Sequence, residues 1–131
     1  QGSLREGSGE LALESGAFRG PYTFKARFEQ GTETNPEELL GAAHAGCFTM
    51  ALTALLAREK LAPTLIHTTA SVHLAQGAGG FTIPKIELVS RAQVPGVTAE
   101  RFAALAADAK VNCPVSKALA GAEITLDAAL E

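Results

Sequence analysis

Two cysteines, Cys47 and Cys113, are the residues of this chain best suited to chemistry, because a thiolate is a strong nucleophile that can also be oxidised and reduced. They lie 66 positions apart without a CxxC motif, so the spacing leaves open whether the two sulfurs meet. Cys47 stands among small apolar residues, where a cysteine more often only fills core space. Cys113 precedes Pro114 and suits a helix N-cap, where free N–H groups and the helix dipole favour a thiolate. A functional and a purely structural Cys113 fit this pattern equally well.

Three polar residues could assist these thiols. His44 lies three residues before Cys47, on the same face of a helix, and could act as a base or a ligand, although a hydrogen-bonded core histidine is commoner. A zinc site of His44, Cys47 and Cys113 would be one ligand short of a closed site. On local evidence, Arg27 is an exposed arginine and Glu37 a first-turn acid. Because Glu37 is about 15 Å from Cys47 along one helix, it would have to arrive from another chain, or the helix would have to bend.

The elements that must position these residues follow from hydrophobic periodicity and turn signals. The sequence predicts one domain over residues 1–131: a β-hairpin over 10–29, a central helix over 36–60, strands over 65–94, helices over 98–120 and a strand over 123–130. In this interpretation Arg27 lies on the polar face of a strand. The order of elements indicates an α+β fold with a mainly antiparallel sheet rather than a βαβ series.

The central helix has the clearest start signal in the chain. Asn35 suits the N-cap, Pro36 the first helical position, and Glu38 a capping box. Residues 39–57 carry no formal charge and could span a membrane by length alone. Their alanines, glycines, histidine and threonines instead indicate a long buried helix, covered by a sheet on one side and by something else, such as a second copy of the chain, on the other.

Composition narrows the function. The chain has 131 residues, 47% of them apolar and 19% charged, with a net charge of −3. These values exclude disorder and give no basic surface for nucleic acid or an anionic membrane. No signal peptide pattern is found, so we expect a cytoplasmic protein. The phosphate loop, the GxSxG elbow and the HExxH motif are all missing. The residues and their spacing alone indicate a soluble α+β domain that could be a dithiol enzyme.

Three segments carry a family resemblance. FKARF at residues 24–28, TNPEELLGAAHAGCF at 34–48 and NCPVS at 112–116 resemble the osmotically inducible protein C (OsmC) family of thiol peroxidases, which is related to the organic hydroperoxide resistance proteins. The similarity extends from about Glu14 to the C-terminus. Both cysteines match the family pattern in order and spacing.

The resemblance implies an intertwined homodimer with its active sites at the subunit interface. Cys47 would be the peroxidatic cysteine and Cys113 the resolving one, with Arg27 and Glu37 as polar partners. The expected substrates are organic hydroperoxides and, less efficiently, hydrogen peroxide. Phe48 and Met50 would form apolar walls. No metal or organic cofactor is expected, and an external dithiol, such as a lipoylated protein, would regenerate the enzyme in stress defence.

Two alternatives remain open at this stage. The first is a non-catalytic dimeric module that binds a small molecule on the same fold, since fold does not fix function. The second is a metal site that uses Cys47, Cys113 and His44. The presence of both cysteines together with Arg27 and Glu37 favours the peroxidase, and a metal assay on protein purified without chelator tests the metal site.

Overall fold

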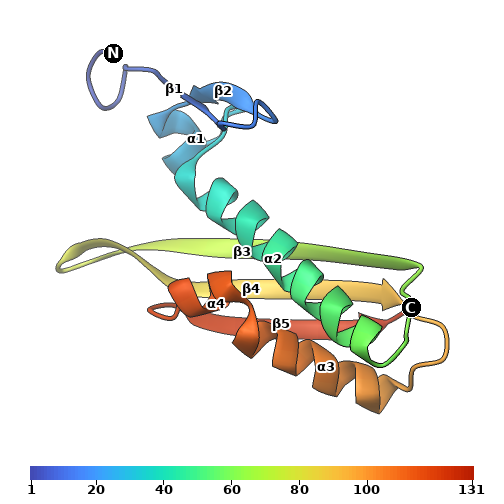
Figure 1. Ribbon diagram of the computed structural model, residues 1–131. Coiled ribbons are helices and arrows are strands. Elements are labelled where there is room, and N and C mark those ends of the chain that lie inside the picture. Colours follow the sequence, from blue (N-terminus) through green and yellow to red (C-terminus); the bar gives the residue numbers. More distant parts are fainter. The chain divides into compact units, whose positions relative to one another are not determined.

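A computed structural model describes residues 1–131 as an α+β protein with two compact units, Gln1–Leu39 and Leu40–Glu131 (Figure 1). The elements in chain order are β1 (Gly9–Ala12), β2 (Arg19–Tyr22), α1 (Phe24–Phe28), α2 (Pro36–Arg58), β3 (Leu65–Gly77), β4 (Gly80–Gln93), α3 (Ala99–Asn112), α4 (Pro114–Ala118) and β5 (Glu123–Leu130).

In the first unit, the predicted hairpin over 10–29 is too long. Strands β1 and β2 pair antiparallel and end at Tyr22, and the next five residues form the short helix α1. The alternating aromatic pattern favoured a strand, but the side chain of Thr23 accepts a hydrogen bond from the N–H of Ala26 and caps a helical turn. Phe24 and Phe28 then lie one turn apart, with ring centroids separated by 4.7 Å. Arg27 therefore lies on a helix and not on the polar face of a strand.

Helix α2 begins at Pro36 as predicted and ends at Arg58, two residues before the predicted Lys60. Lys60 adopts a left-handed backbone conformation with φ of 60°, and the N–H of Leu61 bonds to the carbonyl of Leu56 at 3.0 Å. This is the geometry of a helix end, in which the left-handed residue satisfies the last carbonyls and stops further turns.

One face of α2 is buried within the second unit, and the opposite face is exposed. The buried stripe repeats every three or four residues and consists of Gly41, His44, Phe48, Leu52 and Leu56. A Cβ on Gly41 would lie 3.1 Å from the carbonyl oxygen of Ala70, so the missing side chain lets α2 approach β3 closely. Met50, on the other face, is 76% exposed. Within one chain the sheet covers one face of α2, as predicted, and the predicted cover of the other face stays a prediction.

Helix α2 is also the one helix long and apolar enough to cross a membrane by length and composition. A core helix of a soluble protein passes the same test, and the side chains of Phe48, Leu52 and Leu56 are fully buried in the hydrophobic core. The burial pattern indicates that α2 is a core helix with one face that its own chain does not cover.

The second unit contains a three-stranded sheet in the order β3-β4-β5. Strands β3 and β4 form a long antiparallel hairpin, whereas β5 pairs parallel to β4. The sheets are mainly antiparallel, as predicted, and the parallel pairing of β4 and β5 arises because α3 and α4 form the helical crossover that a parallel pair needs. β5 has the predicted bounds. Pro84 lies at a register shift opposite Leu74, which is the bulge its missing N–H favours.

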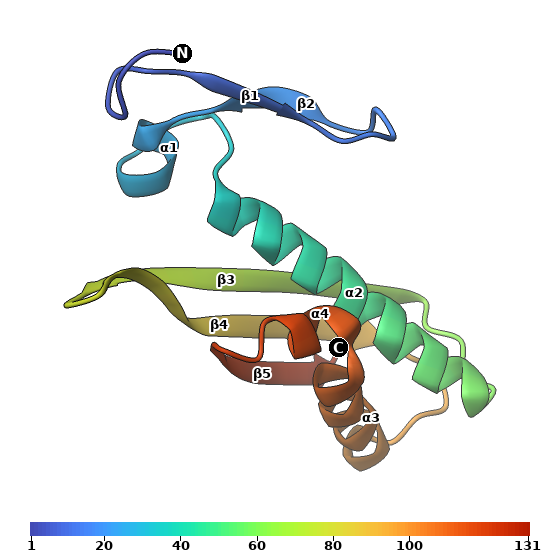
Figure 2. The same ribbon diagram turned by 60° about the vertical axis from the view of Figure 1, so that its left-hand side comes forward.

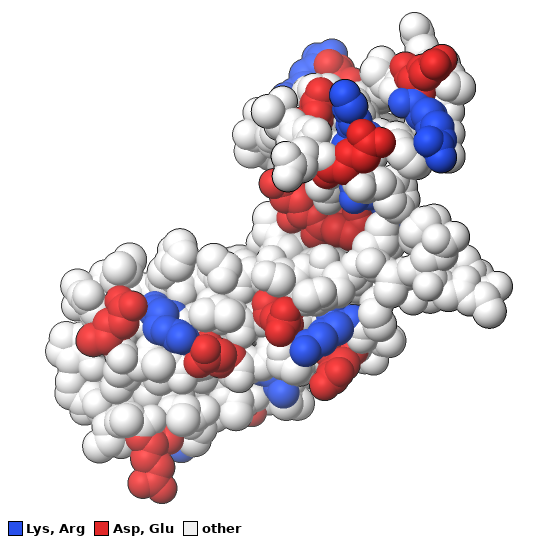
Figure 3. All heavy atoms as spheres, turned by 180° about the vertical axis from the view of Figure 1, so that it is seen from behind, with Lys and Arg blue, Asp and Glu red and all other residues white.

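Helices α2 and α3 lie on the same face of this sheet in both ribbon views (Figures 1 and 2). Phe102, Leu105, Ala106 and Ala109 of α3 join the buried side chains of α2 and of β4 in one core. The other face of the sheet is polar. Seen from behind, this unit has acidic and basic side chains close together (Figure 3). Arg91 of β4 and Asp127 of β5 form an ion pair at 2.9 Å. The core therefore lies entirely between the helices and one face of the sheet.

Candidate functional site

The second unit brings the two cysteines together. Cys47 comes from the middle of α2, Cys113 from the junction of α3 and α4, and their Sγ atoms are 2.8 Å apart in a hydrogen bond. Both are free thiols. The sequence could not show whether the two sulfur atoms meet, because 66 positions separate the two residues. Two thiols at this distance can share a proton or form a disulfide after a small movement.

The two thiols differ in access and in acidity. Cys113 is fully buried, while Cys47 is partly exposed, so a small molecule from solvent can meet only Cys47. Burial raises the pKa of Cys47, and the hydrogen bond to Cys113 raises it further. Burial also acts to raise the pKa of Cys113. The contact with Cys47 and the neighbouring polar groups of Ser116 and Val115 outweigh this effect and lower the pKa of Cys113. Within this chain, Cys113 is the more acidic thiol.

Cys113 lies at the junction of two helices. It ends α3 and stands at the N-cap of α4, with Pro114 at the first helical position, as the sequence predicts. Ser116 follows at i+3, one turn along α4, and the side chain of Cys113 makes no capping hydrogen bond. The sequence analysis did not single out Ser116, although the Cys-x-x-Ser spacing is a signal that could have found it.

His44 is fully buried, and its Nε2 lies 2.8 Å from the hydroxyl of Ser116, which is 72 positions away. Its Nδ1 has no hydrogen-bond partner. Burial lowers the pKa of His44, so the ring is neutral near pH 7. The hydrogen bond to Ser116 occupies Nε2, and no group of three or more His, Cys, Asp or Glu side chains is arranged to hold a metal ion. The metal hypothesis therefore gains no support from the geometry.

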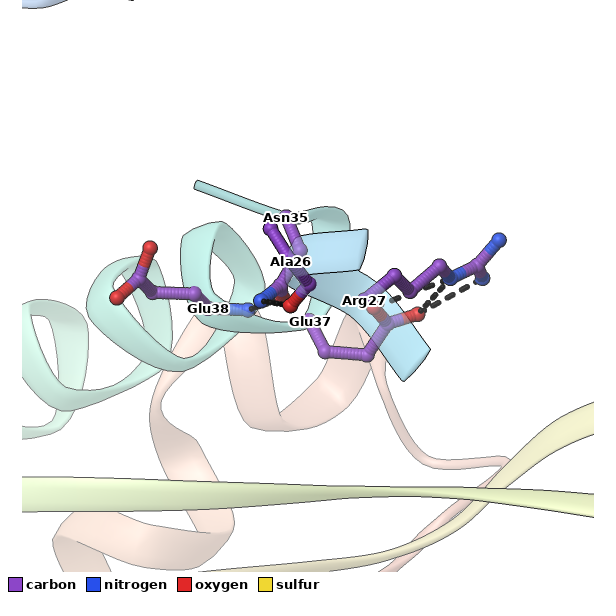
Figure 4. A network of polar contacts seen from close by, with 5 residues as sticks. All are labelled: Ala26, Arg27, Asn35, Glu37 and Glu38. Carbon is purple, nitrogen blue, oxygen red and sulfur yellow. Dashed lines mark hydrogen bonds and ion pairs between the residues drawn. The ribbon is translucent and has the colours of Figure 1, made fainter. Parts of the chain in front are cut away.

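In the first unit, Arg27 and Glu37 form a two-pronged ion pair (Figure 4). Nε of Arg27 lies 3.1 and 3.2 Å from the two carboxylate oxygens, and Nη2 lies 2.8 Å from Oε1. The side chain of Glu37 is 9% exposed and that of Arg27 is 35% exposed. The carboxylate holds the guanidinium in one orientation while part of the guanidinium stays open to solvent.

Asn35 connects the helices that carry this ion pair (Figure 4). Its side-chain oxygen accepts the N–H of Glu38 at 2.8 Å, which caps α2, and its amide nitrogen donates to the carbonyl of Ala26 in α1 at 2.8 Å. The predicted N-cap is confirmed. Glu38 does not reach back to the cap residue as predicted, because its carboxylate accepts the hydroxyl of Thr34 at 2.6 Å.

We expect Asn35→Ala to lower stability by about 1 kcal/mol, because α2 loses its N-cap. The matched variant Asn35→Asp keeps the acceptor for Glu38 and removes only the donor to Ala26, so its loss should be smaller. Thermal unfolding followed by circular dichroism measures both. Equal unfolding temperatures for wild type and Asn35→Ala would show that the cap contributes nothing.

A cavity of about 260 Å³ opens beside Arg27 within the first unit. Its walls include the aromatic rings of Tyr22, Phe24 and Phe28. The sequence analysis expected apolar walls from Phe48 and Met50, but Phe48 is fully buried in the core and lines no open space. The aromatic residues were missed because they were assigned to a strand. The four predicted site residues thus form two pairs, one in each unit.

The comparisons with known proteins agree on one family. The family model described as OsmC-like protein matches residues 29–128, a range that includes Glu37 and both cysteines. The chain is 48% identical over 128 residues to Peroxiredoxin OsmC of Escherichia coli strain K12, covering 97% of this chain and 89% of that protein. It is 39% identical over 92 residues to an organic hydroperoxide resistance protein of Xanthomonas axonopodis pv. citri, covering 70% and 63% of the two chains.

A solved structure supports the fold. The crystal structure of an organic hydroperoxide resistance protein from Elizabethkingia anophelis superposes with a TM-score of 0.78 at 26% sequence identity. The match covers 95% of each chain. The similarity extends over both units and all the candidate site residues.

Proposed function

The chain belongs to the OsmC-like family, and from this premise we propose that it is a cysteine-dependent peroxidase that reduces organic hydroperoxides to alcohols. The names of its relatives, a peroxiredoxin and an organic hydroperoxide resistance protein, support a peroxidase role. The observation that carries the finer proposal is the 2.8 Å contact between one partly exposed and one buried thiol. A catalytic thiol needs access to substrate, and a resolving thiol needs only to reach the first.

Cys47 is the peroxidatic residue in this proposal. Its thiolate attacks the outer oxygen of the hydroperoxide, an S–O bond forms, the O–O bond breaks, and the alkoxide leaves and takes up a proton. Cys47 is then a sulfenic acid. Cys113 attacks its sulfur, so that a disulfide forms and water is released. An external dithiol supplies two electrons and two protons to restore both thiols, and no metal or organic cofactor is required.

Cys47 needs a cation, because burial and Cys113 both raise its pKa in the single chain. Arg27, held by Glu37, supplies a permanent positive charge and N–H donors suited to a thiolate and a peroxide. Helix α2 is continuous from Pro36 to Arg58, so Glu37 and Cys47 are about 15 Å apart along it. We therefore assign the Arg27–Glu37 pair that serves each Cys47 to a second copy of the chain.

A homodimer also accounts for the exposed face of α2. Met50 is 76% exposed although α2 is apolar on all sides, and a second copy would cover this face. The aromatic walls of the cavity at Arg27 suit the alkyl group of an organic hydroperoxide better than hydrogen peroxide. A lipoylated protein would be a suitable external dithiol reductant. The protein would then act in stress defence in the cytoplasm.

The experiment that tests the proposed function is an intact mass measurement. The reduced protein is exposed briefly to one equivalent of an alkyl hydroperoxide. It is then digested, and peptide mapping shows which cysteines are joined. We expect the loss of two hydrogens and a Cys47–Cys113 disulfide. An unchanged mass with both thiols free would overturn the proposal and favour the non-catalytic binding module.

The homodimer has its own prediction. We expect Met50→Glu to yield monomers and to lower peroxide turnover at least tenfold, because a buried, unpaired carboxylate opposes association. The control Val111→Glu changes a residue that is 62% exposed on α3 and should stay dimeric and active. Light scattering after size exclusion gives the mass, and a peroxide assay gives the rate. A fully active monomer would remove the need for a second copy.

A further inference from the structure

Asn35 hydrogen-bonds to the backbone beside each residue of the Arg27–Glu37 ion pair (Figure 4). Its side-chain nitrogen donates to the carbonyl of Ala26 at 2.8 Å, and this carbonyl belongs to the peptide group that leads into Arg27. Its side-chain oxygen accepts the N–H of Glu38 at 2.8 Å, and this N–H belongs to the peptide group that follows Glu37. Because each peptide group is planar and rigid, one amide holds both backbone segments from which the ion pair extends.

Helix α1, which carries Arg27, is not anchored by a buried side chain. It has five residues, none of them is buried, and a helix this short is not stable by itself in water. Gly31 packs closely against it, because a Cβ on Gly31 would lie 3.1 Å from the Cα of Ala26. Contacts of this kind must therefore hold α1 in place, and the bond from Asn35 to Ala26 connects it to the start of α2.

The ion pair alone does not fix the direction of the guanidinium. The side chain of Arg27 is 35% exposed, and an arginine has several rotatable bonds, so it can keep contact with a carboxylate from more than one backbone position. The orientation of the guanidinium toward a substrate then depends on where the backbone of Arg27 lies relative to that of Glu37. Asn35 is the residue that sets this relation, because it bonds to both segments.

We propose that Asn35 is a positioning residue for Arg27: through the two peptide groups it holds the guanidinium in the orientation that serves Cys47 of a second copy. The inference rests on the proposed function, in which Arg27 stabilises the Cys47 thiolate, and it goes beyond that function because it assigns a role to a residue that touches neither thiol nor peroxide. This role is separate from the N-cap, because the cap uses only the oxygen of the amide and the bond to Ala26 uses only its nitrogen.

The variant Asn35→Ser separates the two roles in the full-length protein. Serine is as good an N-cap as asparagine, but its shorter side chain does not reach Ala26, and it adds no charge beside the ion pair. The unfolding temperature should stay close to that of the wild type. We expect the reaction with an alkyl hydroperoxide to slow about tenfold, because a small displacement of a positioned group can cost up to roughly a hundredfold in rate. Thr98→Ala is the matched control: it removes the N-cap of α3, so it should lower stability and leave the rate unchanged.

A double-mutant cycle with Arg27→Ala tests whether Asn35 acts through Arg27. Once the guanidinium is removed there is nothing left to position, so Asn35→Ser should change the rate of the Arg27→Ala protein by less than about twofold. A residue that only supported the fold would lower the rate by the same factor in both backgrounds. An equal factor in both, or an unchanged rate in Asn35→Ser alone, overturns the positioning role.

A measurement without peroxide separates this inference from the proposed function. The Nε–H of Arg27 donates to both carboxylate oxygens of Glu37, and its exchange with solvent can be followed by NMR in the reduced protein. We expect this exchange to be about five to ten times faster in Asn35→Ser, the factor that one lost hydrogen bond gives. An unchanged exchange rate overturns the positioning role. Wild-type protein that forms no disulfide with peroxide overturns the proposed function, whereas the exchange rate still shows whether Asn35 holds Arg27.

Discussion

Replacing Cys47 with serine should lower peroxide turnover by a factor on the order of 10³ or more, because a serine hydroxyl is not ionised at neutral pH and cannot store the oxygen as a sulfenic acid. Serine is close in size to cysteine, so the fold should persist. The measurement is consumption of an alkyl hydroperoxide with excess dithiol. Full activity in this variant would remove Cys47 from the mechanism.

Cys113→Ser is the matched variant, because it keeps Cys47, the proposed peroxidatic thiol, and removes the proposed resolving thiol. It should consume about one equivalent of peroxide and stop, and its mass should rise by one oxygen. With excess peroxide a second oxygen should follow, since nothing converts the sulfenic acid into a disulfide. A variant that cycles normally with dithiol would show that the external reductant attacks Cys47 directly.

Arg27→Ala should slow the reaction of Cys47 with peroxide by a factor on the order of 10² to 10³ and raise the pKa of Cys47. Without the guanidinium, burial and Cys113 both disfavour the Cys47 thiolate. The pH dependence of alkylation in a Cys113→Ser background measures this pKa. Arg27→Lys keeps the charge but loses the two-pronged pairing with Glu37, so it should recover only part of the rate.

Arg19→Ala is the control for removing an arginine from the same unit. Arg19 pairs with Glu10 at 2.7 Å, with side chains that are 74% and 56% exposed, and such a surface pair contributes little. Its alkylation profile should match that of the wild type. The same wild-type profile in Arg27→Ala would rule out the role assigned to Arg27.

The sequence predicted correctly the helix starts that depend on residues next to one another in the chain. The start of α2 follows from Asn35 and Pro36, and the cap at Cys113 follows from Pro114, because each depends on residues adjacent in the sequence. Helix α1 was missed because a single hydrogen bond, from the N–H of Ala26 to the side-chain oxygen of Thr23, decides between a strand and a helical turn. Five residues are too few for periodicity to settle that choice.

Pairings across long sequence distances could not be predicted from the residues. The contact between Cys47 and Cys113, and the one between His44 and Ser116, depend on how α2 packs against the crossover of α3 and α4. Likewise, a helix that is apolar on every side carries no information about which face meets the sheet. The family resemblance, not periodicity, indicated that the two cysteines belong together.

The environment of Cys113 also bears on how the proposed cycle closes. Although burial acts to raise the pKa of Cys113, the contact with Cys47 and the neighbouring Ser116 and Val115 lower it, and a disulfide sulfur carries no charge to stabilise. This environment therefore favours the dithiol over the disulfide and raises the reduction potential of the Cys47–Cys113 couple. A weak biological reductant would then suffice to restore both thiols. The environment that prepares Cys113 to attack would therefore also make the resulting disulfide easy to reduce.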